Sequence, residues 1–290
     1  MDDRGRDRRD PSRLALDVAR AKAGDREALE SVVRAVQPEV YALALRFLWH
    51  PQDAEDATQE ILIRVVTRLG SFAGESAFRT WVYRVASNAL ITSKKKRMEE
   101  RTLTFAEFGA DLARGLEDRP SGESTDPDEV LLLEEVKIGC TLGLLLCLDR
   151  GHRIAYILGE ILELEHQEAA EALEISPAAF RKRLSRARER ISTFMASRCG
   201  LANPANPCRC RKRVDAAISL GRVDPARLLF AGSREQARRF PIVLDEIRRL
   251  EETRRAAALY RSHPVAPAKE ELMSWLANVV AESREGLRCP

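Results

Sequence analysis

The chain has 290 residues, and its net charge of +3 is too small to indicate a partner by itself. The length suits two or three compact domains, and six scattered cysteines do not make a secreted disulfide scaffold. No apolar run approaches the length of a membrane span, and the charged N-terminus does not resemble a signal peptide, so we expect a cytoplasmic protein.

The spacing of apolar residues is helical nearly throughout, and no segment shows a convincing strand pattern. Residues 1–13 are charged and are expected to be disordered. Between residues 14 and 48 the spacing predicts three helices, with breaks at Gly24-Asp25 and at Pro38, and Pro51 marks the end of the third. The sequence therefore predicts an all-α fold.

A cluster of acidic residues opens the next predicted helix, Asp53–Leu69. Carboxylates in a first turn favour the positive end of a helix, so capping is a sufficient explanation for them. The alternative is a polar patch that docks a basic partner. That patch consists of Asp53, Glu55, Asp56, Gln59 and Glu60.

Residues 78–97 combine an amphipathic helix with a basic tract. The face predicted to be buried carries Phe78, Val82, Val85, Ala86 and Ala89. The face predicted to point outward carries Thr80, Arg84, Ser87, Asn88 and Ile91, with Trp81 and Tyr83 on the shoulders. Aromatic side chains beside Lys94–Arg97 suit single-stranded nucleic acid. A place in the core explains Trp81 about as well.

The segment 102–128 is polar and acidic and contains prolines, which predicts a flexible linker. From Glu129 the helical spacing resumes and leads into a long apolar helix, 138–148. Cys140 and Cys147 lie within this helix, where small core residues are the simplest interpretation.

Residues 153–191 predict a helix-turn-helix. His166–Leu173 forms a short amphipathic helix, and Glu174–Ser176 a tight connection. Ser176 is suited to cap a second helix that Pro177 opens.

The second helix of this motif is apolar on one side and cationic on the other. Phe180, Leu184, Ala187 and Ile191 share one stripe, which is expected to pack on the first helix. The opposite face suits the major groove, although solvated basic faces are also common on surface helices. Its candidate DNA-binding residues are Arg181, Lys182, Arg183, Ser185, Arg186 and Arg188.

The motifs from residue 15 to 198 resemble regions 2 and 4 of bacterial RNA polymerase sigma factors of the extracytoplasmic-function group. The resemblance rests on the Asp53–Glu60 segment, on Phe72-Ala-Gly, on Trp81–Asn88 followed by Lys94–Arg97, and on the helix-turn-helix. It implies that the polar patch docks on the coiled coil of the largest polymerase subunit. It also implies that the second helix of the helix-turn-helix reads the −35 element as a duplex.

Melted −10 DNA is the remaining partner that the resemblance implies. The residues expected to bind it are Phe72, Trp81, Tyr83, Arg84, Asn88, Lys94, Lys95, Lys96 and Arg97. The polymerase supplies catalysis, so no catalytic residue and no cofactor are expected. The competing hypothesis is a helix-turn-helix regulator that binds duplex DNA without joining polymerase. An enzyme finds no support, because the four histidines form no catalytic constellation.

The resemblance divides the chain into region 2 (14–101), a linker (102–128), region 4 (129–198) and an extension (199–290). Two positions depart from the family pattern. Thr92 stands where an acidic residue is frequent, and Glu174 stands where glycine is usual in the turn. Glycine accepts a left-handed backbone readily, so Glu174 indicates either local strain or a different turn.

The extension begins with a loop that carries three cysteines within residues 199–211. Zinc binding by Cys199, Cys208 and Cys210, with His263 or Cys289 as a fourth ligand, is one interpretation, although paired C-x-x-C spacing is lacking. A thiol redox switch and free thiols without a role are the others. Helices are predicted at 214–220, 224–230, 241–260 and 269–283. We expect the extension to be a built-in regulator that replaces or supplements an anti-sigma protein.

Overall fold

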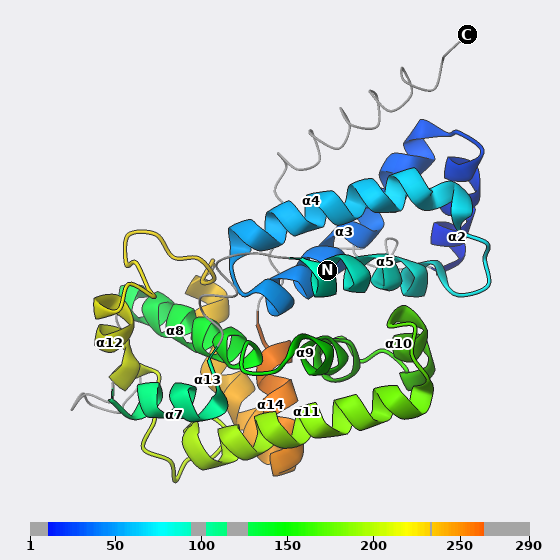
Figure 1. Cartoon of the computed structure of the whole chain (residues 1–290). Helices are drawn as coiled ribbons and strands as arrows, with labels where there is room; N and C mark the ends of the chain where they lie inside the picture. The colour runs from blue at the N-terminus through cyan, green and yellow to red at the C-terminus, as the bar shows by residue number, and fades with distance from the viewer. Residues whose placement is uncertain (1–10, 94–102, 115–126, 233, 264–290) are drawn as a thin grey trace.

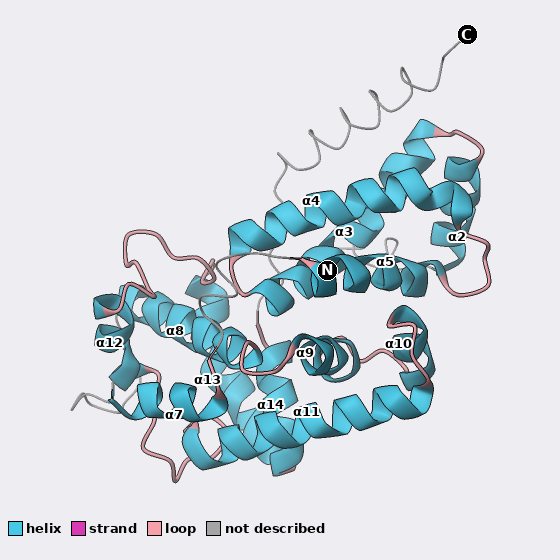
Figure 2. Ribbon diagram, in the orientation of Figure 1, coloured by secondary structure: helices cyan, strands magenta, loops and turns pink. Residues whose placement is uncertain are grey.

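The computed structural model describes residues 11–93, 103–114, 127–232 and 234–263, and within these ranges its regular elements are helices (Figures 1 and 2). An isolated bridge between Cys199 and Cys208 is the one β-type contact there. The predicted all-α class is confirmed. None of the described helices combines the length and apolarity that crossing a membrane requires.

The helices form three consecutive groups. Region 2 contains α2 (Pro11–Lys22), α3 (Arg26–Leu48), α4 (Pro51–Arg68), η1 (Leu69–Ser71) and α5 (Phe78–Thr92). The middle group contains α7 (Phe105–Arg114), α8 (Pro127–Leu145), α9 (Arg150–Tyr156), the π-helical η2 (Ile157–Ile161), α10 (His166–Ala172) and α11 (Pro177–Arg198). The extension contributes η3 (Arg211–Arg213), α12 (Val214–Ser219), α13 (Arg234–Arg249) and α14 (Glu252–Arg261).

The predicted helix break at Pro38 was wrong, because α3 continues through it. A proline removes one backbone donor and usually kinks a helix. Here Val36, Val40 and Leu43 are fully buried on both sides of the proline, and the packing of this face outweighs the lost hydrogen bond. The first helix also begins at Pro11, inside the segment expected to be disordered.

Part of the predicted linker is helical. Thr104 and Glu107 form a capping box, in which the Glu107 carboxylate accepts from the Thr104 backbone N–H at 2.7 Å and the Thr104 hydroxyl accepts from the Glu107 N–H at 3.2 Å. The helix that follows, α7, buries Phe108 and Leu112. The expectation of a flexible tether was therefore wrong for Phe105–Arg114.

The extension also differs from its prediction. Residues 224–230 form turns rather than a helix, and the backbone N–H groups of Leu229, Phe230 and Ala231 donate to the Glu135 carboxylate at 2.8 Å each. The run 241–260 is divided into α13 and α14 near Glu251. The helix expected at 269–283 lies outside the described residues.

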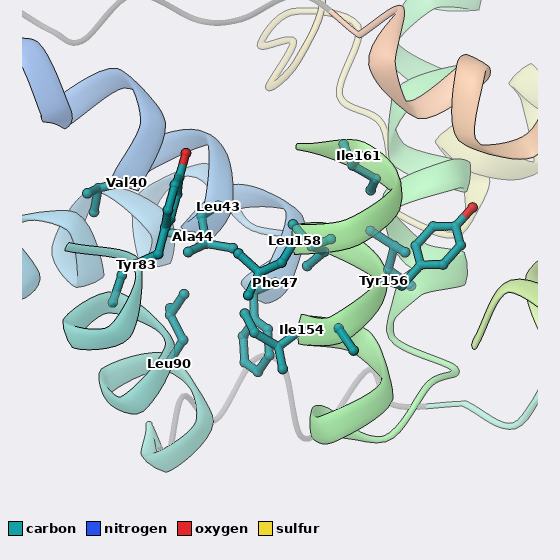
Figure 3. Close-up of a cluster of buried hydrophobic side chains, with 14 of the residues drawn as sticks. Val40, Leu43, Ala44, Phe47, Tyr83, Leu90, Ile154, Tyr156, Leu158 and Ile161 are labelled. Atoms are coloured by element: carbon teal, nitrogen blue, oxygen red, sulfur yellow. The ribbon is translucent and has the colours of Figure 1, made fainter. Parts of the chain in front are cut away.

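One hydrophobic core joins region 2 to the middle group. In Figure 3, the side chains of Leu43, Phe47 and Leu90 from α3 and α5 meet those of α9 and η2. Phe47, Ile154 and Leu158 are completely buried in this cluster. The two sequence modules therefore pack as one body, and α5 lies against α9 and α10 (Figure 1).

A buried arginine connects the ends of two helices at this junction. Arg153 donates to the carbonyl oxygens of Leu145, Leu146 and Leu148 at 3.0, 3.1 and 2.8 Å, and to that of Phe47 at 3.0 Å. Burial lowers its pKa to about 10, so the guanidinium remains charged at neutral pH. It ties the C-terminal end of α3 to the turn after α8.

The extension covers the opposite side of the middle group. The Tyr260 hydroxyl of α14 donates to the Thr141 carbonyl at 2.8 Å, and Arg261 donates to the Glu160 carbonyl at 2.8 Å. Arg211 pairs with Glu129 of α8 at 2.6 Å. The described part of the extension thereby contacts α8 and η2, and α14 also packs directly on α11 of the helix-turn-helix.

Candidate nucleic-acid interface

The acidic patch lies on α4, on the side of region 2 that faces away from α10 and α11 (Figure 1). Asp56 and Glu60 are exposed, and Glu55 and Gln59 are partly exposed. Asp53 is buried, so it is not available to a partner in this form. The N-cap of α4 is His50, whose ring nitrogen accepts from the Gln52 N–H at 3.2 Å. The acids therefore do not supply the N-cap.

The face of α5 that was expected to point outward is largely covered. Thr80 is 3% exposed and Ser87 is fully buried, and α10 and α9 are among the helices that pack against α5. Arg84 and Ile91 are half-buried, and Asn88 remains exposed. The expectation of an open face was wrong for this arrangement, since periodicity along α5 carries no information about a second module that docks there.

Polar contacts also join α5 to region 4 along its contact with α9 and α10, which is called the seam below. Arg84 donates from Nε to the Glu171 carbonyl at 3.3 Å, and Asn88 donates to the Glu174 carboxylate at 3.0 Å. At the other end of α5, one nitrogen of Arg150 donates to the carbonyls of Ile91 and Ser93 at 2.6 and 2.5 Å. Two side chains predicted to bind DNA thus have acceptors on region 4.

The aromatic residues of the predicted single-strand site divide into two kinds. Phe72, Phe78 and Trp81 form a cluster with ring centroids 5.3–5.7 Å apart, and both Phe72 and Trp81 remain partly exposed. Tyr83 is buried, its pKa rises to about 12 through burial, and its hydroxyl donates to the Glu39 carboxylate at 3.4 Å. Tyr83 is therefore a core residue here. Lys94–Arg97 lie outside the described residues.

The predicted helix-turn-helix forms from α10 and α11. The Ser176 hydroxyl accepts from the Ala179 N–H at 3.2 Å, as its capping role requires, and Phe180, Leu184, Ala187 and Ile191 are all buried. Glycine at position 159 allows η2 to approach α11 closely. A Cβ there would lie 2.8 Å from a Leu184 methyl carbon.

The basic face of α11 is open to solvent, with two exceptions. Arg188 donates from Nε to the Glu160 carboxylate at 2.9 Å and faces η2, and Arg183 is half-buried. The predicted DNA-binding residues that remain exposed are Arg181, Lys182, Ser185 and Arg186, together with the ion-paired Arg188.

Two glutamates flank the first helix of the motif in a left-handed backbone conformation. Glu163 has φ +55° and Glu174 has φ +53°. A side chain at such φ values is strained, and this is the conformation that glycine would adopt freely. The departure from glycine at position 174 therefore represents strain rather than a different turn.

The three loop cysteines meet a fourth, Cys140 of α8, around one cavity of about 340 Å³. Burial raises the pKa of each of these thiols, and that of Cys208 reaches about 11. Over the described ranges, no three Cys, His, Asp or Glu side chains are placed to hold a metal ion together. His263 is buried, and its Nε2 instead lies 2.9 Å from the Thr141 hydroxyl. Cys289 lies outside the described residues.

A protonated thiol is a poor nucleophile, so we expect Cys208 to react slowly with iodoacetamide. At pH 8 a thiol with a pKa of about 11 is roughly 0.1% thiolate, which is on the order of a hundredfold less than a free cysteine. The rate should rise about tenfold per pH unit up to pH 10. Peptide mass spectrometry of the folded chain measures this rate, and fast alkylation of Cys208 at pH 8 would contradict the burial argument.

Sequence reasoning missed the contacts of Arg150, Arg153 and Glu171, and it took Cys140 for a core residue without placing it beside the loop cysteines. Arg153 left a signal, since it directly precedes the apolar run Ile154–Leu158. The carbonyl of Glu171 left none, because any residue supplies one.

Comparisons with known proteins match both halves. The family model for sigma-70 region 2 matches residues 32–100, and that for sigma-70 region 4 matches residues 139–191. The ECF RNA polymerase sigma-E factor of Escherichia coli strain K12 is 31% identical over 176 residues, which are 60% of this chain and 90% of that protein.

Two further proteins are similar over the same part of the chain. The RNA polymerase sigma-H factor of Pseudomonas aeruginosa is 29% identical over 177 residues, which are 60% of this chain and 89% of the relative. The structure of CnrH in complex with the cytosolic domain of CnrY aligns with 64% of this chain and 97% of its own, at 24% identity and a TM-score of 0.43.

Proposed function

Because this chain belongs to the extracytoplasmic-function family of RNA polymerase sigma factors and directs promoter-specific initiation of transcription, we propose that its described arrangement is a closed form that must open to bind melted promoter DNA. The observation that carries the proposal is the packing of α9 and α10 against α5, where Arg84 and Asn88 donate to Glu171 and Glu174. In the family this helix meets the −10 element.

The core polymerase dock is open in the closed form. Asp56 and Glu60 are exposed and Glu55 and Gln59 are partly exposed, on a helix that lies away from α10 and α11 (Figure 1). A basic partner can therefore reach them before the seam opens. Binding to the core first and opening second is the order that this geometry favours, and the polymerase would supply the catalysis.

The −35 surface is also open. Arg181, Lys182 and Arg186 project from α11 into solvent, and donors of this kind on a groove-sized helix contact phosphates and the acceptor edges of guanines. The closed form thus engages part of the −10 surface, at Arg84 and Asn88, while Phe72 and Trp81 remain partly exposed. DNA-binding specificity would depend on the two surfaces being held at promoter spacing by the polymerase.

The extension packs on the middle group of helices and thereby supports the closed form. Its α14 packs against α11 and η2, and Tyr260 and Arg261 donate to carbonyls of α8 and η2, respectively. It covers neither the reading face of α11 nor the acids of α4 in the described residues. Self-inhibition would then come from region 4 lying on α5, with the extension stiffening region 4 rather than replacing promoter DNA itself.

The test follows the seam during assembly. Donor and acceptor fluorophores are placed through encoded amino acids at Thr67 of α4 and Thr193 of α11, both exposed, and energy transfer is measured before and after core polymerase is added. We expect high energy transfer in the free protein and lower transfer in the holoenzyme. A promoter is first selected from random DNA with this holoenzyme, and we expect the labelled holoenzyme to transcribe from it. Unchanged transfer in an active holoenzyme would refute the closed form. Tight duplex binding without any affinity for core would favour a regulator that does not join polymerase.

A further inference from the structure

Glu174 occupies a backbone position that its side chain does not favour. Its φ of +53° lies in the left-handed region, where an L side chain with a Cβ is strained and glycine is not. The turn geometry of the helix-turn-helix alone would therefore select glycine. A contact made by the Glu174 side chain could offset the backbone strain at this position.

The Glu174 carboxylate makes such a contact across the seam. It accepts a hydrogen bond from the Asn88 side-chain amide at 3.0 Å. Asn88 is also the exposed polar residue of the covered α5 face. Of the predicted −10 residues on this described face of α5, Asn88 is the exposed one. The hydrogen bond from Glu174 therefore occupies a side chain that packing does not cover.

In the neighbouring contact, too, the donor belongs to α5 and the acceptor to region 4. One turn earlier on α5, Arg84 donates to the carbonyl of Glu171, close to the C-terminal end of α10. The end of a helix that carries free carbonyls attracts cations. Region 4 therefore presents a carboxylate and a carbonyl, both acceptors, to two donors that otherwise face the acceptors of bases and phosphates.

We propose that Glu174 is an intramolecular competitor of promoter DNA, which holds Asn88 in the closed form at the expense of strain in its own turn. This inference rests on the proposed closed form and adds to it a specific residue. Glu174 lies on the turn that precedes α11, so the element that reads duplex DNA also carries the residue that blocks the single-strand site. Separation of the regions frees Asn88, whereas the basic face of α11 is already exposed in the closed form.

The experiment measures the closed fraction without DNA, because a negative charge beside α11 also repels DNA phosphates directly. The full chain with fluorophores at Thr67 and Thr193 is compared with its Glu174→Ala variant, which loses the acceptor and keeps the strain. Loss of one hydrogen bond to a charged but solvent-exposed acceptor should raise the open-to-closed ratio about three- to tenfold. Glu174→Gln retains an acceptor oxygen for Asn88 and should recover most of the closed fraction.

Glu163→Gly is the matched control. Glu163 is the same residue type, in the same left-handed conformation, in the same module, but its carboxylate pairs with Arg261 of α14 at 2.7 Å rather than with α5. This variant relieves equivalent strain and should leave the open-to-closed ratio within about twofold. Glu174→Gly, which relieves the same strain but also removes the acceptor of Asn88, should instead raise the open fraction as Glu174→Ala does.

The possible failures are distinguishable. If the unmodified protein already shows low energy transfer, the closed form and the competitor role are both wrong. If it is closed and Glu174→Ala leaves the ratio unchanged, the closed form stands and the role of Glu174 is refuted. An increase in transcription with no change in closed fraction also refutes the role, since charge repulsion from DNA then explains the effect.

Discussion

Replacement of Arg153 by methionine is expected to lower the free energy of unfolding by about 3–5 kcal/mol, because buried carbonyls lose a charged donor. The substituted side chain fills a similar space but leaves the carbonyls of Leu146, Leu148 and Phe47 without this donor. The Leu145 carbonyl also loses it but still accepts from the Leu148 N–H at 3.1 Å. Each buried polar group without a partner costs about 1–3 kcal/mol before relaxation. Urea unfolding of the full chain, followed by circular dichroism, measures the loss.

Arg150→Met provides the comparison for that experiment. Arg150 bridges the same modules, but it is only partly buried and donates to carbonyls at the end of α5, where water can replace it. We expect a loss of about 1 kcal/mol or less. Equal effects of the two substitutions would show that the four carbonyls around Arg153 find other partners, and that the junction is less tightly determined than the geometry indicates.

The double substitution Arg181→Ala and Arg186→Ala is expected to remove promoter-specific transcription while the complex with core polymerase persists. Each exposed arginine that contacts a base edge contributes about 1–3 kcal/mol, so the pair contributes about 2–6 kcal/mol, or roughly 30- to 10⁴-fold in promoter affinity at a fixed salt concentration. If either arginine binds a phosphate instead, its removal should reduce the slope of the salt dependence of binding by about one unit. Titration of holoenzyme with a −35 duplex measures both quantities.

Arg188→Ala is the internal control for the reading face. Its side chain is already bound to Glu160, so it should affect promoter affinity much less than Arg181 or Arg186, and its effect should appear in the packing of α11 on η2. If Arg188→Ala lowers promoter affinity as much as the other two substitutions, the ion pair with Glu160 must break when DNA binds. Arg188 is then a DNA-binding residue, as the sequence predicts.

The helix-turn-helix was predictable from the sequence because its determinants are local. Ser176 and Pro177 define a helix start, and the stripe from Phe180 to Ile191 follows from a period of 3.6 residues. The same reasoning found the acids of α4. The same reasoning wrongly predicted a helix break at Pro38. Tertiary packing keeps α3 helical through this proline, and a local stretch of sequence does not contain that information.

The seam between the regions was beyond sequence reasoning for a different reason. Ser87 is polar, and nothing in its neighbourhood indicates that its helix will contact α10, which begins about eighty residues later. Contacts at such separation depend on how two modules dock. Glu174 was singled out by the family resemblance, which left open local strain or a different turn; the left-handed φ shows strain, and the hydrogen bond to Asn88 on the other module could not be read from the sequence.

The shared core in Figure 3 has a consequence for how the chain is made. Phe47 and Leu90 leave the ribosome before their packing partners Ile154, Leu158 and Ile161 are synthesised, and the last of these lies 71 residues after Leu90. At 5–20 residues per second, this interval is roughly 4–14 s. During that time the nascent region 2 presents an unfilled apolar surface, so this chain should depend on a ribosome-associated chaperone more than a sigma factor whose first module folds independently.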